Sequence, residues 1–228
     1  MNNELQKRIF TSITLLVGIV FLTFVNPVVF QISLFLIMFI CYLEWSKLNI
    51  NYFKKKNKKN LSKYFLVKLF GIIYLTFVTH SAYHLRGSTF EEALFFIFIL
   101  SICACSDVGG YIFGNFIGGK KLTKISPKKT ISGSIGSFII SLTPIVFVSS
   151  LSNLNFIIDF NFLNILFCLL ISLFCQLGDI FISYFKRLNK VKDTGSILPG
   201  HGGFLDRIDG VILAIPIAYI FKSLNFII

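Results

Sequence analysis

Charged residues are scarce in this chain of 228 residues: they make up only 14% of the sequence, against 55% hydrophobic residues that include 28 Phe. A soluble domain of this length normally carries more charge and less apolar material. Strand-length alternation of apolar and polar residues is also missing, which argues against a membrane barrel. The apolar residues instead come in stretches near the ~20 residues that cross a bilayer as a helix. The composition therefore predicts an all-α integral membrane protein, a polytopic bundle of transmembrane helices without a separate soluble domain.

Cysteine and proline are also sparse. The cysteines all lie inside apolar runs, where a thiol is usually a small buried hydrophobe, so we expect no disulfide framework. Of the five prolines, Pro144 and Pro216 lie inside predicted spans, which we expect them to kink. No small-residue cleavage site follows the first apolar run, so we expect the N-terminal segment to stay on the protein as an anchor.

The apolar stretches predict seven membrane spans, at residues 9–25, 28–44, 65–82, 93–113, 135–151, 161–181 and 208–226. Spans that contain glycine and serine can pack closely against one another. The sequence therefore leaves a homodimer open without defining an interface.

Basic residues define the predicted orientation. All but three of the 22 Lys and Arg residues precede the first predicted span or fall between the second and third, the fourth and fifth, or the sixth and seventh spans. These positions share one side of the membrane, and the positive-inside rule assigns that side, with the N-terminus, to the cytoplasm. The net charge of +12 then comes mostly from cytoplasmic loops, and we expect no nucleic-acid partner. We expect the Lys-rich run 54–59 to contact anionic membrane lipids.

A polar block at residues 178–210, called the second polar block because another precedes it in the chain, stands between the last two predicted spans. It combines carboxylates, basic residues and glycines beside lipid, where a charge costs about 2.5–3.5 kcal/mol at the bilayer centre. If the helix continues past Asp179, then Ser183, Lys186 and Lys190 recur on its face. That polar stripe would suit a metal ion and phosphates. The alternative is a carboxylate at a helix end that faces water.

Two further carboxylates, Asp206 and Asp209, stand three residues apart at the start of the last predicted span. On a helix they point the same way, and hard oxygen ligands of this kind suit magnesium. The alternative role is capping of the helix N-terminus.

A glycine-rich loop, residues 193–203, separates Asp179 from Asp206. Its glycines permit tight turns and present backbone amides to an anion. Together with the carboxylates, the loop has the parts for binding a nucleoside triphosphate with a metal ion, because basic residues surround it: Lys186, Arg187, Lys192 and Arg207. For His201 two roles stay open, donation to a phosphate oxygen and structural packing.

An earlier polar block, residues 106–136, has a similar composition and is called the first polar block. Asp107 ends or interrupts the fourth predicted span, and a glycine-rich segment leads to paired lysines between hydroxyls. Glycines on both sides of the lysines indicate that the backbone closely approaches another group. The candidate phosphate ligands here are Ser126, Lys128, Lys129 and Thr130. The alternative is a solvated loop that only follows the charge pattern of its side.

The segment 183–209 reads SYFKRLNKVKDTGSILPGHGGFLDRID and resembles the signature of the phosphatidate cytidylyltransferase (CDP-diacylglycerol synthase) family. Upstream, QLGD at 176–179 and ISPKKT at 125–130 are similar to family motifs. The resemblance covers the C-terminal half strongly and the N-terminal half in architecture. The family usually has an acidic residue soon after KKT, where this chain has Ser132.

The resemblance implies transfer of a CMP group from CTP to phosphatidate, which gives CDP-diacylglycerol and pyrophosphate for phospholipid synthesis at a bacterial inner membrane. It implies one domain over residues 1–228, with 1–90 as a scaffold and 91–228 carrying the catalytic loops. It implies magnesium as cofactor, held by Asp179 and Asp206 with Asp209 and Asp107 in support. It implies catalytic roles for Asp179, Asp206, Lys186, Arg187, Lys192 and Arg207. Substrate binding is implied for Ser126, Lys128, Lys129, Thr130, Ser183, His201, Gly202 and Gly203.

Two other activities compete with this one. A CTP-dependent lipid kinase would use similar loops but transfer the γ-phosphoryl group, and the complete HGG and DRxD signature favours the cytidylyltransferase. A transporter would scatter charges along its spans, whereas here they gather at one face. His80 and His84 are the main exception; without evident carboxylate or thiol partners for a zinc ion, we expect structural or interfacial roles for them.

Overall fold

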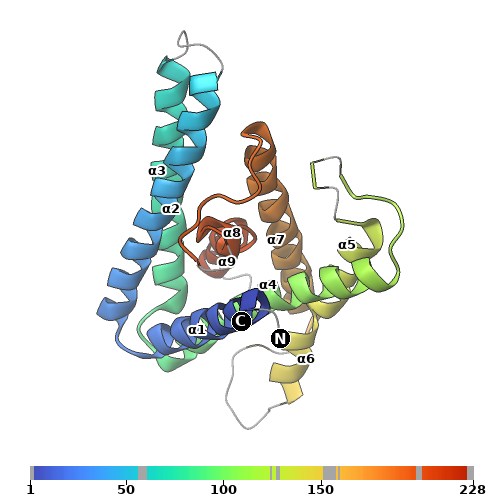
Figure 1. The fold of residues 1–228 in the computed structure, drawn as a ribbon. Coiled ribbons are helices and arrows are strands. Elements are labelled where there is room, and N and C mark those ends of the chain that lie inside the picture. The colour runs from blue at the N-terminus through green and yellow to red at the C-terminus, as the bar shows by residue number, and fades with distance from the viewer. Residues whose placement is uncertain are drawn as a thin grey trace.

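The regular structure is helical throughout the part of the chain that is described. The computed structural model describes residues 3–55, 61–123, 125–126, 129–150, 158, 160–198 and 202–224. The helices are α1 (Asn3–Phe24), α2 (Pro27–Lys55), α3 (Leu61–Arg86), α4 (Phe90–Phe116), α5 (Ile131–Ile140), α6 (Thr143–Ser150), α7 (Phe162–Leu188), α8 (Leu205–Ile208) and α9 (Val211–Ser223) (Figure 1). The prediction of an all-α polytopic membrane protein is confirmed.

Apolar helices correspond to every predicted span. Five segments are long and apolar enough to cross a membrane: Pro27–Asn49, Tyr64–Arg86, Phe90–Phe116, Ile131–Ser150 and Phe162–Leu188. Two shorter apolar helices, Phe10–Phe24 and Val211–Ser223, stand where the first and last spans are predicted. A crossing takes ~20 residues, more than the 13 residues of α9. Among the described residues, α9 is thus shorter than the predicted last span 208–226, whereas α1 with its 22 residues is longer than the predicted first span 9–25.

The outer surface of these helices is apolar. Phe10 in α1 is 72% exposed, and Phe39 in α2 and Phe70 in α3 are also exposed. Exposed apolar patches of this extent are rare on soluble monomers. Such a surface is suited to contact with lipid chains, as the composition predicts.

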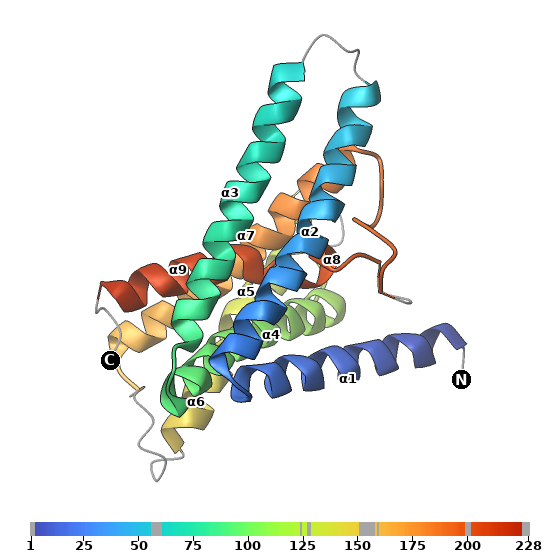
Figure 2. The same cartoon turned by 90° about the vertical axis from the view of Figure 1, so that its left-hand side faces the viewer.

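The long helices α2 and α3 pack side by side as an antiparallel pair, and α1 extends sideways from the end of the pair where α2 begins (Figure 2), in contact with α2 and α4. The short helices α8 and α9 lie between the pair and α7 (Figure 1), and α9 contacts both α3 and α7. The main core joins α4, α7 and α9 through residues such as Ile99, Ile171 and Ala214. The five cysteines are free thiols, as expected, and all but Cys105 are buried.

Helices α4 and α5 approach each other through glycine. A Cβ atom on Gly109 would overlap the carbonyl oxygen of Gly136, and one on Gly136 would overlap the ring of Phe113. Small residues allow this close contact between helices in a membrane protein. At these positions the glycines of the first polar block therefore approach a neighbouring helix: Gly109 of α4 contacts α5, and Gly136 of α5 contacts α4.

Two of the differences between the helix boundaries and the predicted spans bear on the polar blocks. The predicted span 135–151 is divided into α5 and α6 at residues 141–142, just before Pro144, whose missing N–H and ring disfavour a continuous helix. Helix α7 continues past Asp179 to Leu188, as the polar stripe requires. Lys190 lies beyond the helix, with a φ of 55°, and so is not part of that stripe.

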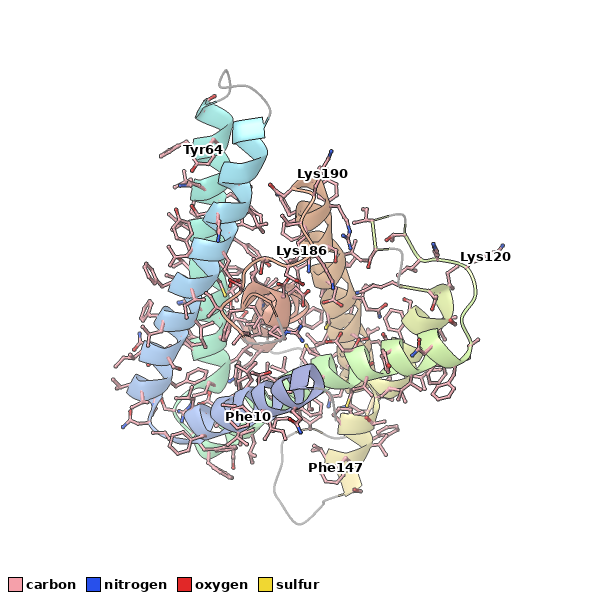
Figure 3. The ribbon with its side chains drawn as sticks, in the orientation of Figure 1. Phe10, Tyr64, Lys120, Phe147, Lys186 and Lys190 are labelled. Carbon is pink, nitrogen blue, oxygen red and sulfur yellow. The ribbon has the colours of Figure 1, made fainter. Side chains whose placement is uncertain are left out.

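The polar loops gather at one end of the molecule. Figure 3 shows Lys190 toward the end where α3 starts near Tyr64, and Lys120 and Lys186 nearer the middle but in the same half of the molecule, whereas Phe147 in α6 lies at the opposite end. The loop between α4 and α5 and the segment after α7 therefore lie at a common end. This agrees with the charge pattern of the sequence; which face of the membrane this end meets stays a prediction.

Candidate active site

The two polar blocks meet at an ion pair between Lys129 and Asp179. The Lys129 Nζ atom lies 2.6 Å from Oδ2 of Asp179 in α7, and both side chains are largely buried. Local pairing holds the lysine in place, because the amide of Leu122 donates to the Lys129 carbonyl at 2.8 Å. The next residue, Thr130, caps α5 by accepting from the Gly133 amide at 3.0 Å. The loop before α5 thus presents one lysine to one carboxylate across 50 residues of sequence.

A polar cavity of about 160 Å³ lies beside this pair. It is lined by residues of α4, α5, α7 and the connecting loop, among them Asp107, Lys129, Thr130, Ser134, Gln176 and Asp179. The Ser134 hydroxyl donates to the Gln176 side-chain carbonyl at 2.5 Å, which fixes two of the polar groups. The cavity therefore combines a cation, carboxylates, hydroxyls and an amide at the polar end of the bundle.

Three carboxylates from different elements lie close together. Asp107 in α4 lies near enough to Asp179 and Lys129 for their charges to act on it. Asp209 follows α8; burial and the nearby Asp179 carboxylate raise its pKa above the usual value. In the part of the chain that is described, no group of three or more acidic, His or Cys side chains is arranged as a complete metal site. Magnesium, however, is often held by one or two carboxylates together with substrate phosphates.

Asp206 organises the second polar block. Its Oδ1 accepts from Lys186 Nζ at 2.8 Å. Its Oδ2 accepts from the amides of Thr194 at 2.8 Å and Gly203 at 3.0 Å. Although burial opposes its charge, the Lys186 ammonium and these amides hold the pKa of Asp206 below its usual value. Both oxygens are thus engaged within the protein, and the metal-binding role of Asp206 stays a prediction.

Glu44 in α2 also contacts this block, and it is not among the site residues predicted from the sequence. Its buried carboxylate accepts hydrogen bonds from the amides of Phe204 and Leu205 and contacts the hydroxyl of Thr194. One signal could have found it, since Glu44 is an acidic residue at the end of a long apolar run. Such residues are costly in a membrane and usually serve a site.

The remaining candidate residues are distributed around these contacts. Ser183 is half-buried on α7, and three basic residues are exposed: Arg187, Lys192 and Arg207. Gly202 has a φ of 84°, and its carbonyl accepts from the Leu198 amide. Ser126 accepts through its carbonyl from the Lys129 amide at 3.1 Å. Lys128 and His201 lie outside the described residues.

Ser132 occupies the position where the family resemblance leads one to expect a carboxylate. Its hydroxyl donates to the carbonyl of Gly118, so it links the start of α5 to the end of the α4 segment. At this position the chain thus has a loop contact in place of an acidic group.

Comparison with known proteins covers most of the chain. The model of the cytidylyltransferase family matches residues 50–224. A protein of Staphylococcus haemolyticus named phosphatidate cytidylyltransferase is 48% identical over 117 residues, which cover 49% of this chain and 42% of that protein. Proteins of the same name are 36% identical over 158 residues in Staphylococcus saprophyticus, covering 67% of this chain and 58% of the relative, and 42% identical over 139 residues in Rickettsia bellii, covering 58% and 57%.

The matched region is partial in these relatives, because the chain spans about half their length. The family match nevertheless includes both polar blocks, with Lys129, Asp179, Lys186 and Asp206. Since it extends over much more than half of the sequence, the chain belongs to the cytidylyltransferase family.

Proposed function

We propose that this protein transfers a CMP group from CTP to phosphatidate, releasing pyrophosphate and forming CDP-diacylglycerol. The observation that carries the proposal is the polar cavity at the end of a membrane span, where Lys129 meets Asp179. The names of the relatives support the same reaction. This location lets a lipid headgroup reach the site while its chains stay in the bilayer.

The reaction brings two anions together. An oxygen of the phosphatidate phosphate attacks the α-phosphorus of CTP, a new P–O bond forms, and the bond from the α-phosphorus to the bridging oxygen breaks as pyrophosphate leaves. Positioned cations lower the barrier by neutralising this charge. We assign this role to Lys129, which lines the polar cavity, and to Lys186, which pairs with Asp206. The hydroxyls of Thr130 and Ser134 also line the cavity and can donate to phosphate oxygens.

Magnesium fits the donor set as an ion completed by substrate. We assign Asp179 and Asp209 as its protein ligands, with Asp107 in support. Asp107 and Asp179 line the cavity, and Asp209 lies close enough to both for their charges to act on it. When bound, magnesium would neutralise charge on the phosphates. For Asp206 to bind the metal directly, Lys186 or the Thr194 and Gly203 amides would have to release an oxygen.

An apolar cavity of about 120 Å³ supports a lipid substrate. Helices α1 to α4 and α9 line it, and Phe204 and Ile208 of the second polar block reach its wall. Hydrocarbon next to a charged loop is the environment that phosphatidate requires. We assign the acyl chains to this side, and we assign the polar end to the cytoplasmic face of a bacterial inner membrane on the basis of the basic loops.

Labelled CTP tests the proposed function. Purified protein with phosphatidate and magnesium should move label from [α-³²P]CTP into lipid and release pyrophosphate. Label from [γ-³²P]CTP should stay in the water-soluble fraction. Lipid labelled from the γ position would identify a lipid kinase, and no transfer from either position would reject both enzymes.

A further inference from the structure

Glu44 is a buried carboxylate whose hydrogen-bond partners, among the residues that the structure describes, are Thr194, Phe204 and Leu205 near the other end of the chain. It is 4% exposed. Its Oε1 accepts from the Phe204 amide at 2.9 Å, and its Oε2 accepts from the Leu205 amide at 2.8 Å. The Thr194 hydroxyl lies 3.0 Å from Oε2. A buried charge is tolerated only when it is well paired, so the segment around α8 supplies what Glu44 requires.

The dependence also runs in the other direction. Helix α8 has four residues, and its own N-cap position makes no side-chain hydrogen bond. A single turn of this kind is not stable in isolation, and its first amides need acceptors. Glu44 provides these acceptors from α2. A helix 160 residues earlier in the sequence therefore caps the turn that carries Asp206.

Thr194 links the two carboxylates directly. Its hydroxyl lies 3.0 Å from Glu44 Oε2 and 3.0 Å from Asp206 Oδ2. The backbone of Gly203 passes so closely that a Cβ atom there would overlap the Thr194 hydroxyl and lie 2.6 Å from Glu44 Oε2. No larger residue fits this position without displacing the carboxylate. A shift of Glu44 would thus be transmitted to Asp206 through the hydroxyl and through the backbone of residues 203–205.

We propose that Glu44 is a positioning residue, which holds the turn at residues 203–206 and thereby orients Asp206 and its partner Lys186. Glu44 acts through these groups and makes no contact with the substrates itself. The kinetic consequence rests on the proposed cytidylyl transfer, whereas the structural consequence does not.

Hydrogen exchange tests the structural part. In Glu44→Gln the side chain keeps its shape, but its NH₂ group faces N–H and O–H donors. We expect amide exchange of the peptide covering residues 202–208 to accelerate about tenfold or more, because hydrogen bonds to a charged acceptor are lost. Glu91→Gln, at an exposed position in the first turn of α4, makes the same chemical change and should leave this peptide unchanged.

Trp45 separates local from global effects. It is the only tryptophan, it neighbours Glu44, and its indole N–H donates to the Val67 carbonyl at 3.2 Å while its ring contacts Phe185. Its emission should stay at the wild-type wavelength in Glu44→Gln, because the packing of α2 on α3 and α7 is retained.

In the hydrogen-exchange experiment, an unaltered exchange rate at residues 202–208 of Glu44→Gln would overturn the proposal.

Kinetics test the functional part. In Glu44→Gln we expect kcat for cytidylyl transfer to fall about tenfold or more, with KM for CTP within about threefold of wild type, because a group acting in the transition state is misplaced. Faster exchange with wild-type kcat would reject the catalytic consequence. An inactive wild-type protein would reject the proposed function instead, while the exchange comparison still tests Glu44.

A second variant covers the case in which Glu44→Gln does not accumulate. Thr194→Val removes the bridging hydroxyl with little change of shape and leaves both carboxylates in place. We expect changes of the same direction in exchange and kcat, but smaller ones, because the Phe204 and Leu205 amides keep Glu44 as acceptor. Wild-type exchange and kcat in Thr194→Val would exclude the link to Asp206.

Discussion

The two polar blocks have similar compositions but use their glycines and charges differently. In the first, Gly109 and Gly136 let α4 and α5 pack closely, and Lys129 extends to Asp179 in α7. In the second, Glu44 and Asp206 bind the loop backbone through its amides. A glycine-rich, basic sequence can thus build either a helix contact or a folded loop. The difference depends on whether a buried carboxylate is available to bind the backbone.

The largest effect should come from Asp179, where the two blocks meet. Asp179→Asn keeps the shape but removes the charge that pairs with Lys129 and that we assign to magnesium. We expect cytidylyl transfer to fall about 1,000-fold or more, measured as lipid label from [α-³²P]CTP. The variant should still insert and purify as wild type does. Near-normal turnover would remove Asp179 from the site and leave the blocks functionally separate.

Asp206 tests the second block alone. Asp206→Asn keeps an oxygen that can accept from the Thr194 and Gly203 amides but loses the charge opposite Lys186. We expect kcat to fall roughly 100-fold. Exchange at residues 202–208 should change less than in Glu44→Gln. If exchange rises more in Asp206→Asn, then Asp206 and not Glu44 is the main support of the loop.

Lys129 tests whether the first block binds phosphate. Lys129→Gln should raise KM for CTP about tenfold, since one charge-assisted hydrogen bond to phosphate is lost. Lys120→Gln, at an exposed position of the same loop, is the matched control and should alter KM less than about twofold. An equal rise of KM for CTP in both variants, with the same rise on addition of salt, would show that the loop acts only through its general positive charge.

The smallest effect on activity should come from the helix contact. Gly136→Ala introduces a methyl group against Phe113, and overpacking of this kind costs about 1–3 kcal/mol. We expect a lower thermal midpoint and a loss of activity of a few fold as Lys129 shifts. Gly18→Ala, where a Cβ atom would meet nothing within 4 Å, is the control and should not lower the midpoint. A wild-type midpoint in Gly136→Ala would show that the close contact is dispensable.

Much of the fold could be predicted because the relevant signals are local. Apolar runs predict the helices, and the charge pattern agrees with the polar loops at one end. The continuation of α7 past Asp179 followed from helical spacing. The break before Pro144 followed from the chemistry of proline, although its position within the predicted span did not.

The candidate active site could be predicted from the sequence only in part. Asp179, Lys186 and Asp206 are visible in sequence because they interrupt apolar or glycine-rich patterns, but the pairing of Lys129 with Asp179 depends on tertiary packing. Glu44 was missed because one carboxylate at the end of a span looks like a boundary residue. Its partners lie 150 or more residues away, and spacing along a single sequence contains no signal for such a contact.

The distance between Glu44 and its partners has a consequence for biogenesis. After Glu44 is added to the nascent chain, 160 further residues must be made before the Phe204 amide exists. A chain that stops before residue 194 lacks all three of these donors, the Thr194 hydroxyl and the Phe204 and Leu205 amides. In such a chain the Glu44 carboxylate of α2 is without them. Synthesis of the segment from Thr194 to Leu205 supplies these donors, so the paired burial of Glu44 depends on nearly the whole chain having been made.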